Sequence, residues 1–230
     1  MAFWSVRATS ALAEFAILAP ERYDPRRAIV GGASATRLGD VVSCVRETIA
    51  PTARDDRLYV IVDTTNSREG VLHNSRSAAL ISTVGSNKKV TRPGDVIISR
   101  LRPYLRQVAL VDNRLPGLTT DNLVACSTEY FVLRSLNGES IAYLVPLLLS
   151  PQVQEVLAAA QEGGHHPRVS DETVLNLPLP AEMAAQRAVI SDRVEQAISM
   201  YRTSEAEIVA TIGVATSSFA GSAKLNLIAS

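Results

Sequence analysis

The C-terminal part of the chain carries the pattern that most restricts its fold. From Ala181 to Phe219 the sequence has no proline and a single glycine, Gly213. Apolar side chains recur there at steps of three, four and seven residues, which predicts one long amphipathic helix with a heptad-like stripe. With a rise of about 1.5 Å per residue, this helix is roughly 58 Å long. A small domain cannot cover such a stripe alone, so we expect it to pair with a second helix.

The stripe defines the residues expected at the dimer contact. They are Ile190, Val194, Tyr201, Ile208, Ile212 and Phe219. The segment 181–220 is therefore interpreted as a dimerisation and spacer helix, and the small, polar residues 221–230 as a flexible tail.

The part of the chain before this helix is predicted to be rich in β-structure. Short runs of Val, Ile and Tyr, each bounded by Gly, Pro, Asn or Asp, are typical of strands. These runs cover residues 41–45, 58–62, 95–99, 107–111 and 130–133. Shorter helices are expected within 139–161, with a break near Pro151, and after Ser170 as an N-cap. The fold class is α+β, with residues 1–180 forming one domain.

Composition limits the compartment and the chemistry. The two cysteines, Cys44 and Cys126, cannot build a disulfide framework and suit a reducing environment. The longest apolar run, 141–149, is too short to cross a bilayer. We therefore expect a cytoplasmic protein that does not contact membranes.

Charge is segregated rather than high. The chain has 23 basic and 23 acidic side chains. The segment 83–106 nevertheless gathers Lys88, Lys89, Arg92, Arg100, Arg102 and Arg106 against one acid, Asp95. A basic patch on a neutral protein indicates an anionic partner at one face, and phosphate backbones are the commonest such partner. If the strand continues to residue 102, Arg100 and Arg102 share a face beside Tyr104. The alternative is a solvated loop with scattered arginines.

Other polar motifs favour ordinary structural roles. Asp40 and Asp95 each precede a strand in a Gly-Asp-Val unit, where an aspartate commonly accepts hydrogen bonds from local backbone N–H groups. In Gly163–Arg168, adjacent His165 and His166 point in different directions and are poor joint metal ligands. A polar loop that contacts a ligand is the better interpretation, with Arg168 as a further cation. No P-loop, dinucleotide fingerprint, zinc-protease or nucleophile-elbow motif is present.

The order of motifs resembles the specificity subunits of type I restriction–modification systems. The most specific parts are Pro93-Gly94-Asp95 followed by Val-Ile-Ile-Ser-Arg, and Leu177-Pro-Leu-Pro180 with Gln186 before a long helix. The resemblance covers about residues 20–220. The chain departs from the family pattern at His165-His166-Pro167. Full specificity subunits carry two target-recognition domains and two long helices, whereas this sequence carries one of each and so resembles a half-subunit.

The resemblance implies a non-catalytic, sequence-specific binder of double-stranded DNA. It implies an adenine methyltransferase subunit as partner, which binds S-adenosylmethionine, and a restriction subunit that can join the complex. It also implies antiparallel helix pairing, as a homodimer or with a different half-subunit. Lys88, Lys89, Arg92 and Arg106 then become candidates for phosphate contact, and Arg100, Arg102 and Tyr104 for base contact, with His165, His166 and Arg168 in a second contact loop.

Two other functional classes remain open from the residues alone. One is a non-catalytic scaffold that binds proteins through a small β-domain and a dimerising helix, which the slight acidic excess of residues 182–207 favours. The other is an enzyme that uses the His165–His166 loop, for which no partner residues at catalytic spacing are evident.

Overall fold

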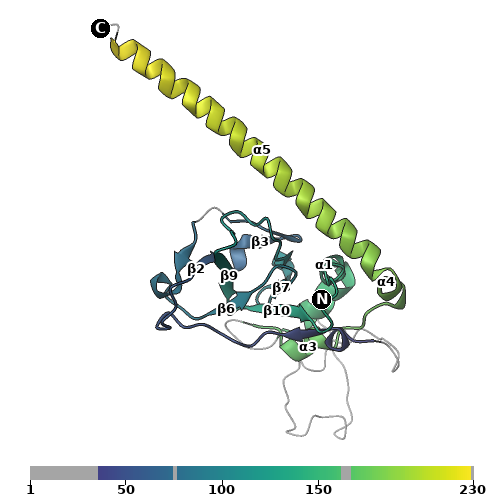
Figure 1. Cartoon of the computed structure of the whole chain (residues 1–230). Helices are drawn as coiled ribbons and strands as arrows, with labels where there is room; N and C mark the ends of the chain where they lie inside the picture. Colours follow the sequence, from purple (N-terminus) through teal and green to yellow (C-terminus); the bar gives the residue numbers. More distant parts are fainter. Residues whose placement is uncertain (1–35, 75–76, 162–166, 229–230) are drawn as a thin grey trace, which may run out of the picture.

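The computed structural model describes residues 36–74, 77–161 and 167–228, with side chains as far as Val214. Within these residues a β-rich domain is followed by short helices and one long C-terminal helix (Figure 1). The predicted α+β class is confirmed. The segments 1–35 and 162–166, which include His165 and His166, lie outside the described residues.

Two four-stranded sheets form the body of the domain. The first has the order β1 (Val42–Cys44), β10 (Tyr130–Ser135), β7 (Val96–Ser99), β8 (Val108–Leu110), and all its neighbours are antiparallel. The second has the order β5 (Ala79–Leu80), β2 (Leu58–Val62), β9 (Asn122–Ser127), β6 (Lys88–Thr91). In this second sheet β2 and β9 are parallel, and the other pairs are antiparallel. A small hairpin joins β3 (Ser67–Arg68) to β4 (Val71–Leu72).

The five predicted strands all appear, as β1, β2, β7, β8 and β10. The sequence pattern missed β6 and β9. Strand β6 begins with two lysines, Lys88 and Lys89, which read as a surface loop. Strand β9 lies between β2 and β6, and its parallel pairing with β2 joins residues more than 60 positions apart along the chain. Such pairing depends on long-range contacts and leaves no local signature.

Strand β7 contributes side chains to both large hydrophobic cores of the domain. Val96 and Ile98 face the core that is also formed by the short helices, whereas Ile97 faces the core between the sheets. Both faces of β7 are therefore buried, and all four of its residues are apolar or small. Alternation of side chains along a strand produces this division.

The turn before β7 forms as the sequence predicts. Gly94 has a φ of 93°, and the Asp95 backbone N–H donates to the Arg92 carbonyl at 3.0 Å across the turn. The Asp95 carboxylate accepts from the Arg92 backbone N–H at 2.8 Å and from two guanidinium nitrogens of Arg134 at 2.9 and 2.7 Å. Asp40 likewise accepts from the Arg37 backbone N–H at 2.7 Å. The structural role of both aspartates is confirmed.

The short helices also begin where capping residues indicate. Helix α1 (Leu144–Leu149) ends at Ser150, which caps α2 (Pro151–Ala159) by accepting from the Val153 backbone N–H. Ser170 caps α3 (Asp171–Leu175) by accepting from the Thr173 backbone N–H at 3.2 Å. The predicted break at Pro151 follows because proline fits the first turn of a new helix but not the interior of an old one.

The C-terminal helical region differs from the prediction at both ends. Instead of one helix from Ala181, α4 (Ala181–Ala185) ends at Gln186, and α5 (Arg187–Ile228) follows. The Gln186 backbone N–H donates to the Glu182 carbonyl at the end of α4. The Gln186 carbonyl accepts a hydrogen bond from the Ile190 backbone N–H at the start of α5. Helix α5 also continues past residue 220 into the segment expected to be a flexible tail, which contains no proline to stop it.

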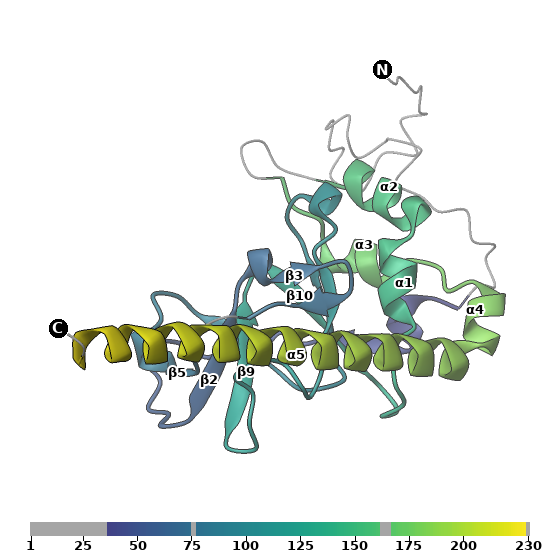
Figure 2. The ribbon, with the colours of Figure 1, turned by 90° about the horizontal axis from the view of Figure 1, so that it is seen from above.

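The N-terminal half of α5 lies along the domain (Figure 2), and one buried guanidinium, that of Arg202, joins it to the domain. Arg202 is 3% exposed. It donates to the Asp112 carboxylate at 2.7 and 3.2 Å, to the Leu72 carbonyl at 2.6 Å and to Glu205 at 2.9 Å. One turn earlier Ile198 is buried in the domain core. This face of α5 is therefore fixed to its own domain.

The predicted dimer stripe is divided by this docking. Ile190 and Val194 pack against the core of their own domain, and the Tyr201 hydroxyl lies 3.2 Å from Nδ1 of His73. Ile208 and Ile212 remain 59% and 60% exposed. The C-terminal part of α5 extends beyond the domain (Figure 1). The prediction that the whole stripe needs a second helix is wrong for its first part, because the domain itself supplies the cover. The Phe219 side chain lies outside the described residues.

Both thiols are held in the un-ionised form. Burial raises the pKa of Cys126 to about 12. The pKa of Cys44 is raised to about 11, mainly by burial and to a lesser extent by the nearby Asp171 carboxylate. No helix among the described residues is long and apolar enough to cross a membrane.

Replacing Arg202 with Met should lower the free energy of unfolding by about 3–5 kcal/mol, because it leaves the buried Asp112 carboxylate without its partner. Urea unfolding followed by circular dichroism measures this change. Arg193→Met, on an exposed position of the same helix, is the matched control. Equal stability of the two variants would contradict the anchoring role of Arg202.

The folded protein should react slowly with Ellman's reagent at pH 8, because only a thiolate attacks the reagent and both thiol pKa values lie well above this pH. The Cys44 rate should rise with pH towards about 11. Cys44→Ser separates the two thiols, and urea-unfolded protein gives the rate of free access. Rapid reaction of two thiols in the folded chain would overturn the prediction.

Candidate nucleic-acid interface

The loop that follows β7 presents exposed basic and aromatic side chains of the predicted patch. Strand β7 ends at Ser99, so the conditional extension of the strand to residue 102 does not occur. Arg102 adopts φ 46° and ψ 66°, in the left-handed region, and begins the short 3₁₀ helix η7 (Pro103–Leu105). The chain then returns to β8. Arg100 and Arg102 consequently belong to a loop rather than to one face of a strand.

The tip of this loop is held in a strained conformation. Arg106, at the other end of η7, is also left-handed with φ 51°. Each such non-glycine residue costs about 1–3 kcal/mol, which surrounding contacts must offset. Pro103 is buried, whereas Tyr104 is 69% exposed and Leu105 is 44% exposed. The fold therefore gives up some stability to keep an aromatic and an apolar side chain exposed between Arg102 and Arg106.

A neighbouring hairpin supports the strained tip. Glu69 and Gly70, between β3 and β4, both have positive φ, at 47° and 100°. The Glu69 carboxylate lies 3.6 Å from Nε of Arg106, and the Gly70 backbone N–H donates to the Val108 carbonyl at 2.8 Å. A side chain at Gly70 would meet Val145 at 3.1 Å. The tight hairpin thus sets the position of Arg106.

The structure brings the first predicted contact segment against Arg168, which belongs to the described part of the second. Leu101 and Arg168 form an antiparallel bridge, and the Val169 backbone N–H donates to the Arg100 carbonyl at 3.0 Å. Residues separated by more than 60 positions in sequence therefore form one surface. No local pattern predicts this approach, although both segments were recognisable by their cations.

Glu129 is the residue of this surface that the sequence reasoning missed. It lies in the turn between β9 and β10. Its carboxylate accepts from Nε and an Nη of Arg168 at 3.0 and 2.7 Å, and lies 4.0 Å from Nε of Arg100. The hydrogen bond to Glu129 raises the pKa of Arg168. The Arg100 guanidinium also lies over the Phe131 ring at 5.5 Å. Only the sheet register places this acid beside the two arginines.

The two lysines are largely used inside the fold. Lys88 is 6% exposed, donates to the Ser86 hydroxyl at 2.9 Å and lies 3.5 Å from Asp63. Lys89 donates to the Tyr130 carbonyl at 2.8 Å, and burial lowers its pKa. Pairing of β6 with β9 draws both ammonium groups inward, contrary to the expectation of surface phosphate contacts. Arg92 is exposed beside the Pro93–Gly94 turn.

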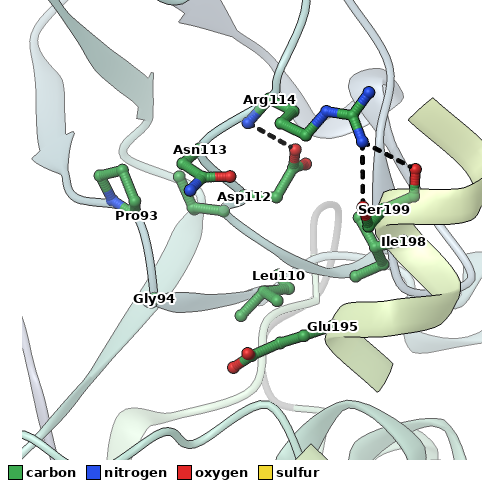
Figure 3. Close-up of a pocket in the computed structure, with 10 residues that line it drawn as sticks. Pro93, Gly94, Leu110, Asp112, Asn113, Arg114, Glu195, Ile198 and Ser199 are labelled. Atoms are coloured by element: carbon green, nitrogen blue, oxygen red, sulfur yellow. Dashed lines mark hydrogen bonds between the residues drawn. The ribbon is translucent and has the colours of Figure 1, made fainter. Parts of the chain in front are cut away.

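A separate hollow lies where α5 meets the domain. It measures about 230 Å³, with Leu110 and Ile198 among the residues that line it (Figure 3). Arg114 closes one side by donating to the Ser199 carbonyl and hydroxyl at 3.1 and 2.9 Å. None of the residues predicted to contact DNA lines this hollow. In the described ranges no group of His, Cys, Asp and Glu side chains could hold a metal ion.

The chain resembles two solved structures but matches no family model and no curated protein. A chain from a study of complex assembly and conformational transition of the type I R-M system is 29% identical, with a TM-score of 0.54 over 75% of this chain. The HsdS subunit from Thermoanaerobacter tengcongensis is 27% identical, with a TM-score of 0.50 over 75% of this chain.

The chain spans 44% of the length of each of these two proteins. Both comparisons point to the same kind of protein as the ordered motifs around Pro93–Asp95 and Leu177–Pro180. The resemblance of this chain to the specificity subunits of type I restriction–modification systems is therefore confirmed.

Proposed function

We propose that the chain is a DNA sequence-recognition element of a type I-like restriction–modification or methylation-linked defence system. The observation that carries this proposal is the joining of the Ser99–Arg106 loop and Arg168 into one basic surface with Tyr104 at its exposed tip. The likeness to HsdS supports the same role. The surface is small, positively charged and aromatic, which suits contact with a duplex groove.

The contacts can be assigned by exposure. Arg92 and Arg106, which keep partly or fully exposed side chains, are proposed to contact phosphates. Arg102 and Tyr104, at the strained tip, are proposed to reach base edges. Lys88 and Lys89 support the sheet rather than touching DNA. A preorganised tip loses little conformational freedom on binding, which favours recognition by shape.

The chain is proposed to be non-catalytic and to position an adenine methyltransferase subunit. That partner would bind S-adenosylmethionine and extrude the target base from the duplex. A restriction subunit would join the same complex. The likeness to a chain from a type I R-M assembly supports this arrangement.

The distal part of α5 is proposed to pair with a second long helix. Ile208, Val209 and Ile212 are 59–64% exposed and lie within two turns of each other. An antiparallel pair would place two recognition domains at opposite ends of a rod of fixed length. The target would then be bipartite, and palindromic if two copies of this chain pair. Pairing with a different half-subunit would give an asymmetric target.

A protein-binding scaffold is the second candidate. The exposed apolar side chains Met200, Val209 and Val214 on α5 favour it. A scaffold would show neither a salt-dependent affinity for DNA nor a sequence preference.

Co-expression with a partner methyltransferase, followed by single-molecule sequencing of host DNA, tests the recognition role. We expect methyladenine at a bipartite motif. Arg102→Gln combined with Tyr104→Ala should abolish or change that motif, because a lost base contact costs about 1–3 kcal/mol at its position. Arg193→Gln, on the exposed side of α5, is the control for charge. An unmethylated host genome and no complex on purification would favour the scaffold.

Replacing Ile208 and Ile212 together with Asn should weaken helix pairing at least about a hundredfold, because each buried isoleucine contributes about 1.5–3 kcal/mol. Light scattering after size-exclusion chromatography measures the association. Val189→Asn, also at an exposed apolar position of α5, is the matched control. An association that survives the double substitution would show that other residues hold the pair.

A further inference from the structure

Glu129 occupies an unusual position within the basic surface. It is an acid whose carboxylate faces two arginines that are proposed to lie at the DNA contact, Arg168 and Arg100. Its backbone is fixed independently of the side chain. The Glu129 carbonyl accepts from the Arg100 backbone N–H at 2.9 Å, and the Glu129 N–H donates to the Ser127 hydroxyl at 3.3 Å.

The Glu129 carboxylate binds the same edge of the Arg168 guanidinium that an anionic ligand would bind. The two bonds from Nε and Nη, at 3.0 and 2.7 Å, form the bidentate fork that arginine also offers to a phosphate or to guanine. Arg100 has only a long contact to the same carboxylate, and its Nε is buried without a hydrogen-bond partner among the described residues. One guanidinium is therefore occupied, and the other retains an unused donor.

A second arginine–carboxylate pair of the same geometry shows what a purely structural pair looks like here. Arg134 donates two hydrogen bonds to the Asp95 carboxylate, at 2.9 and 2.7 Å. The Asp95 side chain, however, is only 4% exposed and also accepts from the Arg92 backbone N–H. The Glu129 side chain is 28% exposed and that of Arg168 is 39% exposed. A pair this exposed to solvent contributes little to stability, so the Glu129 carboxylate can be exchanged for another anion at little cost to the fold.

We propose that Glu129 is an internal competitor for the DNA backbone: it neutralises Arg168 and Arg100 in the free protein and is displaced by a phosphate when DNA binds. This inference rests on the proposed DNA-binding function. Because the arginines exchange one anion for another, and because the displaced carboxylate stays near the duplex, Glu129 weakens attraction to any DNA. The surface then depends more on contacts at the Arg102–Tyr104 tip, which carries the proposed base readers.

The test compares the full-length wild-type chain with Glu129→Gln. Fluorescence anisotropy with a labelled duplex of mixed sequence gives the dissociation constant at several NaCl concentrations. We expect Glu129→Gln to bind several-fold more tightly and to steepen the slope of log affinity against log salt by about one unit. Adding Arg168→Gln to Glu129→Gln should remove most of this gain, because Arg168 is the cation that Glu129 holds.

Glu207→Gln is the matched control. It makes the same change of net charge at an exposed position on α5, away from the basic surface, and should leave the slope unchanged. Thermal unfolding should give similar midpoints for all single variants. Weaker DNA binding by Glu129→Gln with an intact fold, or an unchanged slope, would overturn the inference.

Immobilised heparin separates this inference from the proposed function. As a general polyanion, heparin should retain Glu129→Gln to a higher salt concentration than the wild type and Glu207→Gln. If the wild type binds no DNA but this difference remains, Glu129 competes with polyanions other than DNA, and the recognition role fails. If DNA binding is found but neither the heparin elution nor the salt slope changes, the recognition role stands and the competitor role fails.

Discussion

The buried guanidinium of Arg202 is the contact on which the geometry of this molecule depends. It joins α5 to the Asp112 carboxylate and to the Leu72 carbonyl, which belong to two different parts of the β-domain. With Ile198 one turn earlier, it fixes the direction in which the helix leaves the domain. A charge buried this deeply must keep its partner, because an unpaired Arg202 or Asp112 would carry the full desolvation cost. The helix therefore leaves the domain in a direction set by these contacts, and any second helix that pairs with its distal turns would be oriented relative to the basic surface through them.

The basic surface illustrates why a local count of charges is a poor guide to free charge. Of the cations in 83–106, Lys88 and Lys89 serve the interior, and Arg106 faces Glu69. Arg100 and Arg168 share Glu129. What remains open to solvent is Arg92 and a strained tip with Arg102 and Tyr104. Stored backbone strain at an exposed tip is typical of a functional position, because only a requirement for that geometry opposes its relaxation.

The likeness to type I specificity subunits extends over three quarters of this chain but less than half of each of the other chains. A single β-rich domain on a single long helix agrees with that ratio. In such an arrangement the distal apolar turns of α5, the basic surface and the Arg202 anchor act together. In the pairing proposed above, the anchor sets the angle and the distal turns set the spacing, and the surface is proposed to read each half of a site.

The sequence by itself determined the local elements. Five strands, the Pro93–Gly94 turn, the Ser170 cap and the long helix all follow from short-range patterns of hydrophobicity, β-branching and capping. The helix break at Gln186 and the inward lysines of β6 were not visible in the pattern, because tertiary pairing overrides propensity there. Only the tertiary structure decided which part of the α5 stripe is exposed to solvent, since the domain covers Ile190 and Val194 and leaves Ile208 and Ile212 exposed. It alone also brought Glu129 to Arg168, because contacts between distant residues depend on strand register and loop approach, which no local segment encodes.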